Sequence, residues 1–122
     1  MKKLEAITRH AEVSEKAIEK YLVQEVKAIG GICLKYSNAN MVGYPDRVVC
    51  LHGGKVVWVE LKSKGKKPTK IQTIRQNELV SMGHEVYTID NKQTIDELIK
   101  VWRAEKRGTD HTNIRKQRCS GY

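Results

Sequence analysis

Two acids and a lysine near the middle of the chain are the residues whose types and spacing could do chemistry. Asp46 follows a proline, and Glu60 and Lys62 stand at the end of an apolar run that begins after Lys55. A carboxylate at the end of a buried strand is costly unless a cation or a metal compensates its charge. Two carboxylates that lie close together repel unless they share a proton or a divalent ion. The residues therefore predict a divalent-cation site if Asp46 approaches Glu60, whereas the alternative is that Glu60 and Lys62 neutralise one another.

A hairpin must bring these acids together. The turn signal Gly53-Gly54 separates strands predicted over 47–51 and 55–62, and alternation places the two charged residues at the end of the second strand on one face. A two-residue turn would place Asp46 opposite Leu61 and send its side chain to the other face. The cation site therefore requires a connection of odd length, a bulge, or an Asp46 that lies before regular pairing begins. The sequence leaves these three possibilities open.

A third acid comes from a helix predicted over 14–29, with Ser14 as its N-cap. Its apolar stripe recurs at helical spacing and consists of Ile18, Leu22, Val26 and Ile29. Glu15 lies close to the middle of this stripe on a helical wheel, so we expect it to face inward and to reach the sheet edge where Asp46 and Glu60 converge. The alternative role for Glu15 is that of a first-turn acid that complements the helix dipole.

The other predicted elements complete a mixed sheet flanked by helices. They are a strand over 32–36, a loop over 37–45, a helix from Thr69 to near Gly83, a strand over 85–89 and a last helix from Thr94 that should end before Gly108. The order α-β-β-β-α-β-α indicates an α/β (α+β) fold. We expect one domain over 1–102 and a basic, flexible tail over 103–122.

The charge of the chain favours a polyanionic partner. Lys and Arg outnumber Asp and Glu by 23 to 14, which gives a formal net charge of +9. Such an excess neutralises phosphates and releases counterions. Five lysines follow in close succession after the apolar strand, at positions 62, 64, 66, 67 and 70. The alternative for such a run is a solvated face.

The composition also excludes several classes of protein. No apolar run reaches the length of a membrane span and the N-terminus has no signal-peptide pattern, so we expect an intracellular, cytoplasmic protein with no membrane partner. The three cysteines have neither a CxxC motif nor a histidine at zinc-ligand spacing, which indicates neither a disulfide framework nor a zinc site.

Four sequence elements in order resemble the virus-type replication-repair nuclease (VRR-NUC) family of the PD-(D/E)xK superfamily. They are Glu15, Gly43-Tyr44-Pro45-Asp46, Glu60-Leu61-Lys62 and Gln72. The resemblance covers about residues 14 to 99 and implies a restriction-endonuclease-like fold. It also implies a metal-dependent endonuclease that hydrolyses phosphodiester bonds in DNA.

The resemblance assigns a role to each matched residue. It implies that Asp46, Glu60 and the backbone carbonyl of Leu61 bind Mg²⁺ or Mn²⁺, ions that oxygen ligands suit. It implies that Lys62 positions the attacking water or stabilises developing charge. Glu15 is expected to hold an outer-sphere water or a second ion. Gln72 is expected to orient the nucleophile or a phosphate, and its position in a capping box gives it a structural alternative.

The substrate expectation also follows from the resemblance. Small stand-alone members are similar to homodimeric junction-cleaving nucleases of phage origin, which implies branched DNA such as four-way (Holliday) junctions, and a phage protein in a bacterial host. We expect the lysines of the 64–70 stretch to grip the DNA backbone, namely Lys64, Lys66, Lys67 and Lys70. Val101 and Trp102 extend the apolar pattern of the last helix and predict a two-fold interface, unless Trp102 covers its own core. Two rival functions are a restriction-type endonuclease of the same superfamily and a non-catalytic nucleic-acid-binding module.

Overall fold

The computed structural model describes residues 14–105. Its elements are α2 (Glu15–Ala28), β1 (Ile32–Lys35), β2 (Arg47–Leu51), β3 (Lys55–Leu61), α3 (Lys70–Ser81) and β4 (Glu85–Ile89), followed by a last helix over residues 92–105. This order confirms the predicted α-β-β-β-α-β-α arrangement. The tail predicted over 103–122 lies outside the described residues, apart from residues 103–105, which are helical.

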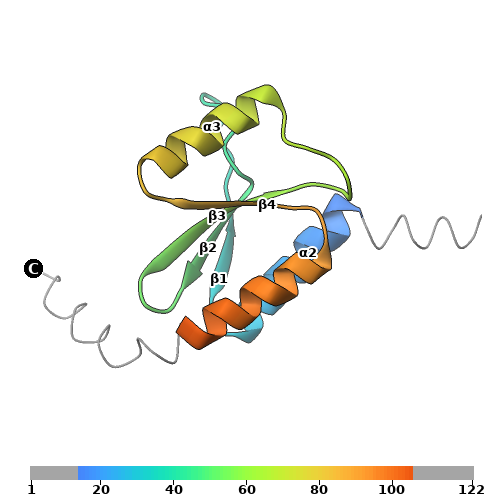
Figure 1. The fold of residues 1–122 in the computed structure, drawn as a ribbon, viewed down its shortest axis with the longest axis vertical. Coiled ribbons are helices and arrows are strands. Elements are labelled where there is room, and N and C mark those ends of the chain that lie inside the picture. The colour runs from blue at the N-terminus through green and yellow to red at the C-terminus, as the bar shows by residue number, and fades with distance from the viewer. Residues whose placement is uncertain (1–13, 106–122) are drawn as a thin grey trace, which may run out of the picture.

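Within the described residues the strands form one mixed sheet in the order β1-β2-β3-β4. The pairs β1–β2 and β2–β3 are antiparallel, and β3–β4 is parallel because α3 crosses over between them. Figure 1 shows α3 on one side of the sheet, with α2 and the last helix on the other. The sheet is therefore sandwiched between helices, and its two faces meet different partners.

The hydrophobic core lies between the sheet and the pair formed by α2 and the last helix. Alternating β3 residues Val57, Val59 and Leu61 are buried there, as the period-two pattern predicts. They pack with the α2 stripe, with Val49 and Ile89, and with three residues of the last helix, Ile95, Ile99 and Trp102. Of the two possibilities left open for Trp102, the structure shows the one in which it covers its own core, since Trp102 is only 2% exposed. The neighbouring Val101 is exposed.

The opposite face of the sheet consists of three cross-strand rows. The first is Ile32, Cys50 and Val56, and the second is Leu34, Val48, Trp58 and Val86. The third row extends the same registers through Tyr36, Asp46, Glu60 and Thr88. The first two rows are apolar, whereas the third contains both acids of the candidate site. The polar chemistry is thus confined to one end of a mostly apolar face.

No helix within residues 14–105 has both the length and the apolar character that crossing a membrane requires.

Candidate active site

The length of the β2–β3 turn decides where Asp46 lies. Leu51 pairs with Lys55, so three residues connect the strands instead of the two expected from Gly53-Gly54 alone. Both glycines have positive φ angles, 92° and 72°, a conformation that glycine adopts without strain. Arg47 and Val59 are the last paired residues at this end of the β2–β3 ladder. Extending the same register by one residue places Asp46 opposite Glu60. Of the three possibilities left open by the sequence, the odd-length connection is the one observed.

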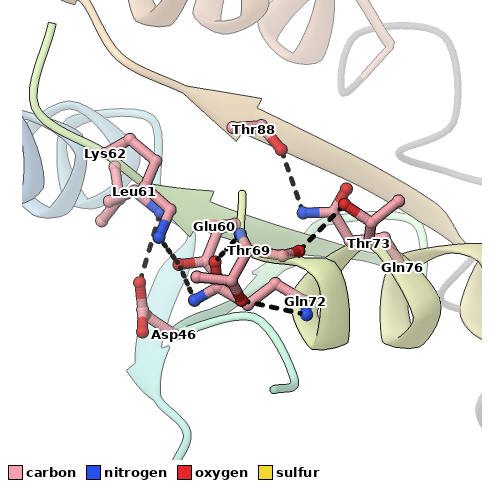
Figure 2. Close-up of polar contacts among 9 residues, drawn as sticks. All are labelled: Asp46, Glu60, Leu61, Lys62, Thr69, Gln72, Thr73, Gln76 and Thr88. Atoms are coloured by element: carbon pink, nitrogen blue, oxygen red, sulfur yellow. Dashed lines mark hydrogen bonds and ion pairs between the residues drawn. The ribbon is translucent and has the colours of Figure 1, made fainter. Parts of the chain in front are cut away.

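Glu60 is a buried carboxylate with one oxygen satisfied and one oxygen without a partner. Its side chain is 2% exposed. Gln72 Nε2 donates a hydrogen bond to Glu60 Oε2 at 3.3 Å, and Lys62 Nζ lies 3.7 Å from the same oxygen (Figure 2). While both carboxyls are ionised, Glu60 Oε1 has no hydrogen-bond partner among residues 14–105. An unpartnered buried oxygen is costly, so this side of the carboxylate needs a proton or a cation.

Asp46 is held beside Glu60 by a hydrogen bond from the backbone of Leu61. Leu61 N donates a hydrogen bond to Asp46 Oδ2 at 3.3 Å. Burial, the negative charge of Asp46 and a hydrogen bond with the Asp46 carboxyl together raise the pKa of Glu60 to about 8. The ammonium of Lys62 opposes this shift, and the charge of Glu15 adds to it. Two acids in this arrangement cannot both ionise cheaply without a positive charge between them.

These donors fit a hard divalent cation. Carboxylate oxygens are ligands that Mg²⁺ and Mn²⁺ prefer, and the unpartnered Glu60 Oε1 is an oxygen that such an ion would satisfy. The described residues contain no group of three or more His, Cys, Asp or Glu side chains placed to hold a metal. The protein carboxylates at the site are therefore Asp46 and Glu60, and backbone carbonyl, water or phosphate oxygens would have to supply the other ligands. The role of the Leu61 carbonyl stays a prediction.

Glu15 does not face the core as its position on the helical wheel predicted. It is exposed in the first turn of α2, after Ser14, whose side chain accepts a hydrogen bond from Ala17 N at 3.2 Å. Glu15 directly follows the N-cap, so it lies in the first turn, before the buried residues of the helix. The first fully buried residue of α2 is Ile18. Glu15 is nevertheless near enough for its charge to raise the pKa of Glu60. Its catalytic role stays a prediction.

Gln72 forms the capping box that the sequence offered as its structural alternative, and it also contacts Glu60, whereas its role toward the nucleophile or a phosphate stays a prediction. Its Oε1 accepts a hydrogen bond from Thr69 N at 2.9 Å, which completes the capping box of α3. The same amide group then directs Nε2 toward Glu60. The cap fixes the orientation of the amide, so the donor that meets the buried carboxylate is preorganised.

The sequence analysis missed a second glutamine beside this one. Gln76 lies one turn after Gln72 on α3, and its Nε2 donates to Thr88 Oγ1 at 3.0 Å (Figure 2). Thr88 is the register partner of Glu60 on β4. The sequence could have indicated Gln76, because residues four apart on a helix share one face and Gln76 is four residues after Gln72.

Three of the predicted phosphate-binding lysines lie on the segment that joins β3 to α3, and Lys70 is the first residue of α3. All four are exposed: Lys64, Lys66, Lys67 and Lys70. Gly65 N donates to Asp90 Oδ2 at 3.1 Å, which fixes the segment to the end of β4. Since both flanking elements carry site residues, the positive charges flank the candidate site. Their contacts with DNA stay a prediction.

The fold and the hairpin site together define the class of protein. A mixed sheet with paired acids and a Glu-x-Lys at the end of a hairpin is the restriction-endonuclease-like PD-(D/E)xK arrangement. A solved structure described as "VRR_NUC domain" aligns with a TM-score of 0.67 and 29% identity, over 70% of this chain and 94% of that one. No family model matches the sequence.

A curated relative agrees with this assignment. The chain is 42% identical over 80 residues to "Putative nuclease p44" of Acyrthosiphon pisum secondary endosymbiont phage 1. The match covers 66% of this chain and 86% of that protein. The chain belongs to the VRR-NUC family, as the resemblance in its sequence indicated.

The raised pKa of Glu60 predicts a pH-dependent loss of stability in the metal-free protein. The folded state keeps the Glu60 proton up to about pH 8, whereas the ordinary value of the group is 4.5. Folding takes up a proton between these values, so the free energy of unfolding falls as the pH rises through this window. Glu60→Gln removes the titration, and denaturant unfolding at pH 5 and pH 8 in EDTA should show a smaller fall than in wild type.

The control for this measurement is Glu97→Gln, which changes an exposed acid on the last helix. It should keep the pH dependence of the wild type. An identical pH dependence in wild type and Glu60→Gln would show that the Glu60 carboxyl is not protonated in the folded protein.

Proposed function

We propose that this protein is a divalent-metal-dependent DNA endonuclease that hydrolyses phosphodiester bonds. The observation that carries the proposal is the buried Glu60 carboxylate beside Asp46, with an oxygen that lacks a partner within the described structure. Such a pair is unfavourable in a protein that merely binds nucleic acid, because uncompensated acids repel phosphate. Membership of the VRR-NUC family and the name of the phage relative support the same function.

Asp46, Glu60 and the Leu61 carbonyl would hold Mg²⁺ or Mn²⁺. When bound, such an ion lowers the pKa of a water and neutralises charge on the phosphoryl oxygens in the transition state. Burial of Glu60 keeps bulk water away from one side of the pair and strengthens its electrostatic interaction with a cation.

The neighbouring side chains would act on the scissile phosphate and the attacking water. The Lys62 ammonium lies on the Glu60 side of the hairpin, where it would position the water or stabilise negative charge on the phosphate. The Gln72 amide, fixed by its cap, would hold Glu60 and orient the nucleophile or a phosphate. Glu15, at the exposed start of α2, would hold an outer-sphere water or a second ion.

A direct test of this function replaces the site residues one at a time. Asp46→Asn, Glu60→Gln and Lys62→Ala should each reduce the cleavage rate on the order of 10²-fold or more. Affinity for DNA in EDTA should be unchanged or higher for the two acid variants, because phosphate repulsion is reduced. Cleavage of labelled linear, flap and four-way-junction DNA in Mg²⁺, Mn²⁺ or EDTA would measure this.

Glu97→Gln is the matched control for the acids and should cleave like wild type. Wild-type cleavage in EDTA would contradict metal dependence. Robust cleavage by Asp46→Asn or Glu60→Gln would contradict the assigned site.

The substrate backbone would be held by the lysines of the β3–α3 connection and the first residue of α3. Lys64, Lys66, Lys67 and Lys70 are exposed beside two elements that carry site residues. Exposed lysines bind phosphate with little sequence information, so they would give affinity for any DNA shape.

The salt dependence of binding tests these lysines. The triple variant Lys66→Ala/Lys67→Ala/Lys70→Ala should weaken binding to linear and branched DNA alike. Each lost contact should reduce the slope of log affinity against log salt by about 0.9 for duplex DNA. Lys20→Ala/Lys27→Ala/Lys100→Ala removes the same charge from α2 and the last helix, and should change the slope much less. Equal effects of both triple variants would indicate that net charge alone attracts DNA.

We further propose branched DNA as the substrate and a homodimer as the active form, acting as a phage protein in the bacterial cytoplasm. Two-fold symmetry suits paired incisions in a branched duplex. The open apolar face of the sheet, with Ile32, Leu34 and Val56 exposed, offers a surface that a second copy could cover. The phage origin of the relative supports the cellular setting. Light scattering that gave a monomer at micromolar concentration would contradict the dimer.

A further inference from the structure

The loop between β1 and β2 presents two large apolar side chains at its tip. Met41 is 45% exposed and Val42 is 60% exposed. Gly43, with φ +96°, brings the loop against α3, because a Cβ added there would lie 2.9 Å from Ile71 Cγ1. Ile71 and Ile74 are also exposed, and they lie one turn apart on α3. These four apolar residues, Met41, Val42, Ile71 and Ile74, are called the apolar tip below.

The conformation of this loop is fixed before any partner binds. Asn38 Oδ1 accepts hydrogen bonds from two successive backbone N–H groups, including that of Met41 at 3.0 Å. Arg75 Nε donates to the Val42 carbonyl at 3.0 Å, and its guanidinium lies 5.0 Å from the centre of the Tyr44 ring. The exposed side chains therefore stand on a clamped backbone, so binding through them would cost little ordering entropy.

The base of the loop is anchored by aromatic side chains on the sheet. The Tyr36 ring packs edge-on against Trp58 at 5.4 Å and against Tyr44 at 6.3 Å between centroids. Tyr44 OH donates to Glu78 Oε1 on α3 at 3.0 Å. These contacts tie the loop to both β3 and α3, the two elements that carry Glu60 and Gln72.

The apolar tip is connected to the candidate active site through short stretches of chain. The loop runs from Val42 through Gly43-Tyr44-Pro45 into Asp46, and Ile71 immediately precedes Gln72 on α3. Lys70, which is exposed, immediately precedes Ile71. Positive charge and exposed apolar surface thus adjoin one another at the start of α3, the helix whose Gln72 contacts Glu60.

Nucleic acid with unstacked bases is the ligand whose chemistry matches this combination. The lysines complement phosphates, whereas apolar side chains gain contacts with the faces of bases that have lost their stacking partners. A continuous duplex hides those faces, and a branch point exposes them. A second copy of this chain fits less well, because a two-fold interface centred on the apolar tip would bring the lysines of both copies together.

We propose that Met41 and Val42 form a wedge that contacts unstacked bases next to the scissile phosphate and so selects branched DNA over continuous duplex. The proposal rests on the proposed nuclease function for the location of the scissile phosphate. It assigns selectivity to a rigid loop next to the metal site, whereas the lysines provide affinity that does not depend on DNA shape.

The test compares two pairs of exposed apolar residues. Met41→Ser/Val42→Ser removes the wedge, and Val80→Ser/Met82→Ser is the matched control, since both of its residues are exposed at the far end of α3. Circular dichroism melting should show both variants folded. The probe is a four-way junction with 2-aminopurine next to the branch point, and a linear duplex with the same label, both titrated in EDTA so that binding is separated from cleavage.

Wild type and the control should raise 2-aminopurine fluorescence on the junction, and should prefer the junction over the duplex. The wedge variant should lose the fluorescence increase and reduce the preference by about ten-fold, which corresponds to about 1.4 kcal/mol. Its affinity for the linear duplex should stay within about two-fold of wild type, because the lysines are intact. Cleavage of both substrates in Mg²⁺ is measured in parallel.

The possible results separate this proposal from the nuclease function. If wild type unstacks the junction but cuts no DNA, the nuclease function is wrong and the wedge stands. If wild type cuts DNA but the wedge variant matches the control in fluorescence and preference, the wedge is wrong and the function stands. If the wedge variant turns a dimer into a monomer in light scattering, the apolar tip is a protein interface and the proposal is overturned.

Discussion

The structure depends on one unfavourable pair, the buried carboxyl of Glu60 beside Asp46. The pairing is fixed by a three-residue hairpin connection, which sets the two acids in one cross-strand row. Hydrophobic packing on the opposite face of β3 holds the strand in place, so Glu60 cannot turn toward water without moving Val59 and Leu61. Packing of the hydrophobic core therefore keeps the two acids together, although their electrostatic repulsion favours separating them.

The elements around this pair offset only part of its cost. Lys62 and Gln72 both meet one oxygen of Glu60, while no residue in the described part of the chain donates to the other oxygen. Gln72 is oriented toward the carboxylate because the same side chain caps α3, which links the start of the helix to the β2–β3 hairpin. A site built in this way is preorganised to bind a small cation. This explains why acids are tolerated in a chain whose remaining surface is strongly basic.

The sequence was sufficient for the order of elements and for the residues of the hairpin, because alternation and capping signals are local. It was insufficient for the register, because His52 joins the two glycines in the turn and nothing local decides between two and three connecting residues. Glu15 was misplaced for a related reason. A helical wheel gives direction around the axis, whereas exposure depends on which neighbour covers each turn, so Glu15 is exposed, and the same limit left the burial of Trp102 undecided until the packing was known. The apolar tip likewise arises from packing between distant segments.

The central claim is that a divalent cation, and not a proton, satisfies the acid pair in the working protein. Anomalous diffraction from crystals soaked in Mn²⁺ tests it most directly. The account predicts an anomalous peak between the carboxylates of Asp46 and Glu60, and no peak there in crystals of Asp46→Asn treated in the same way. A wild-type crystal whose two carboxyl groups remain hydrogen-bonded to each other, with Mn²⁺ bound elsewhere or nowhere, would contradict it.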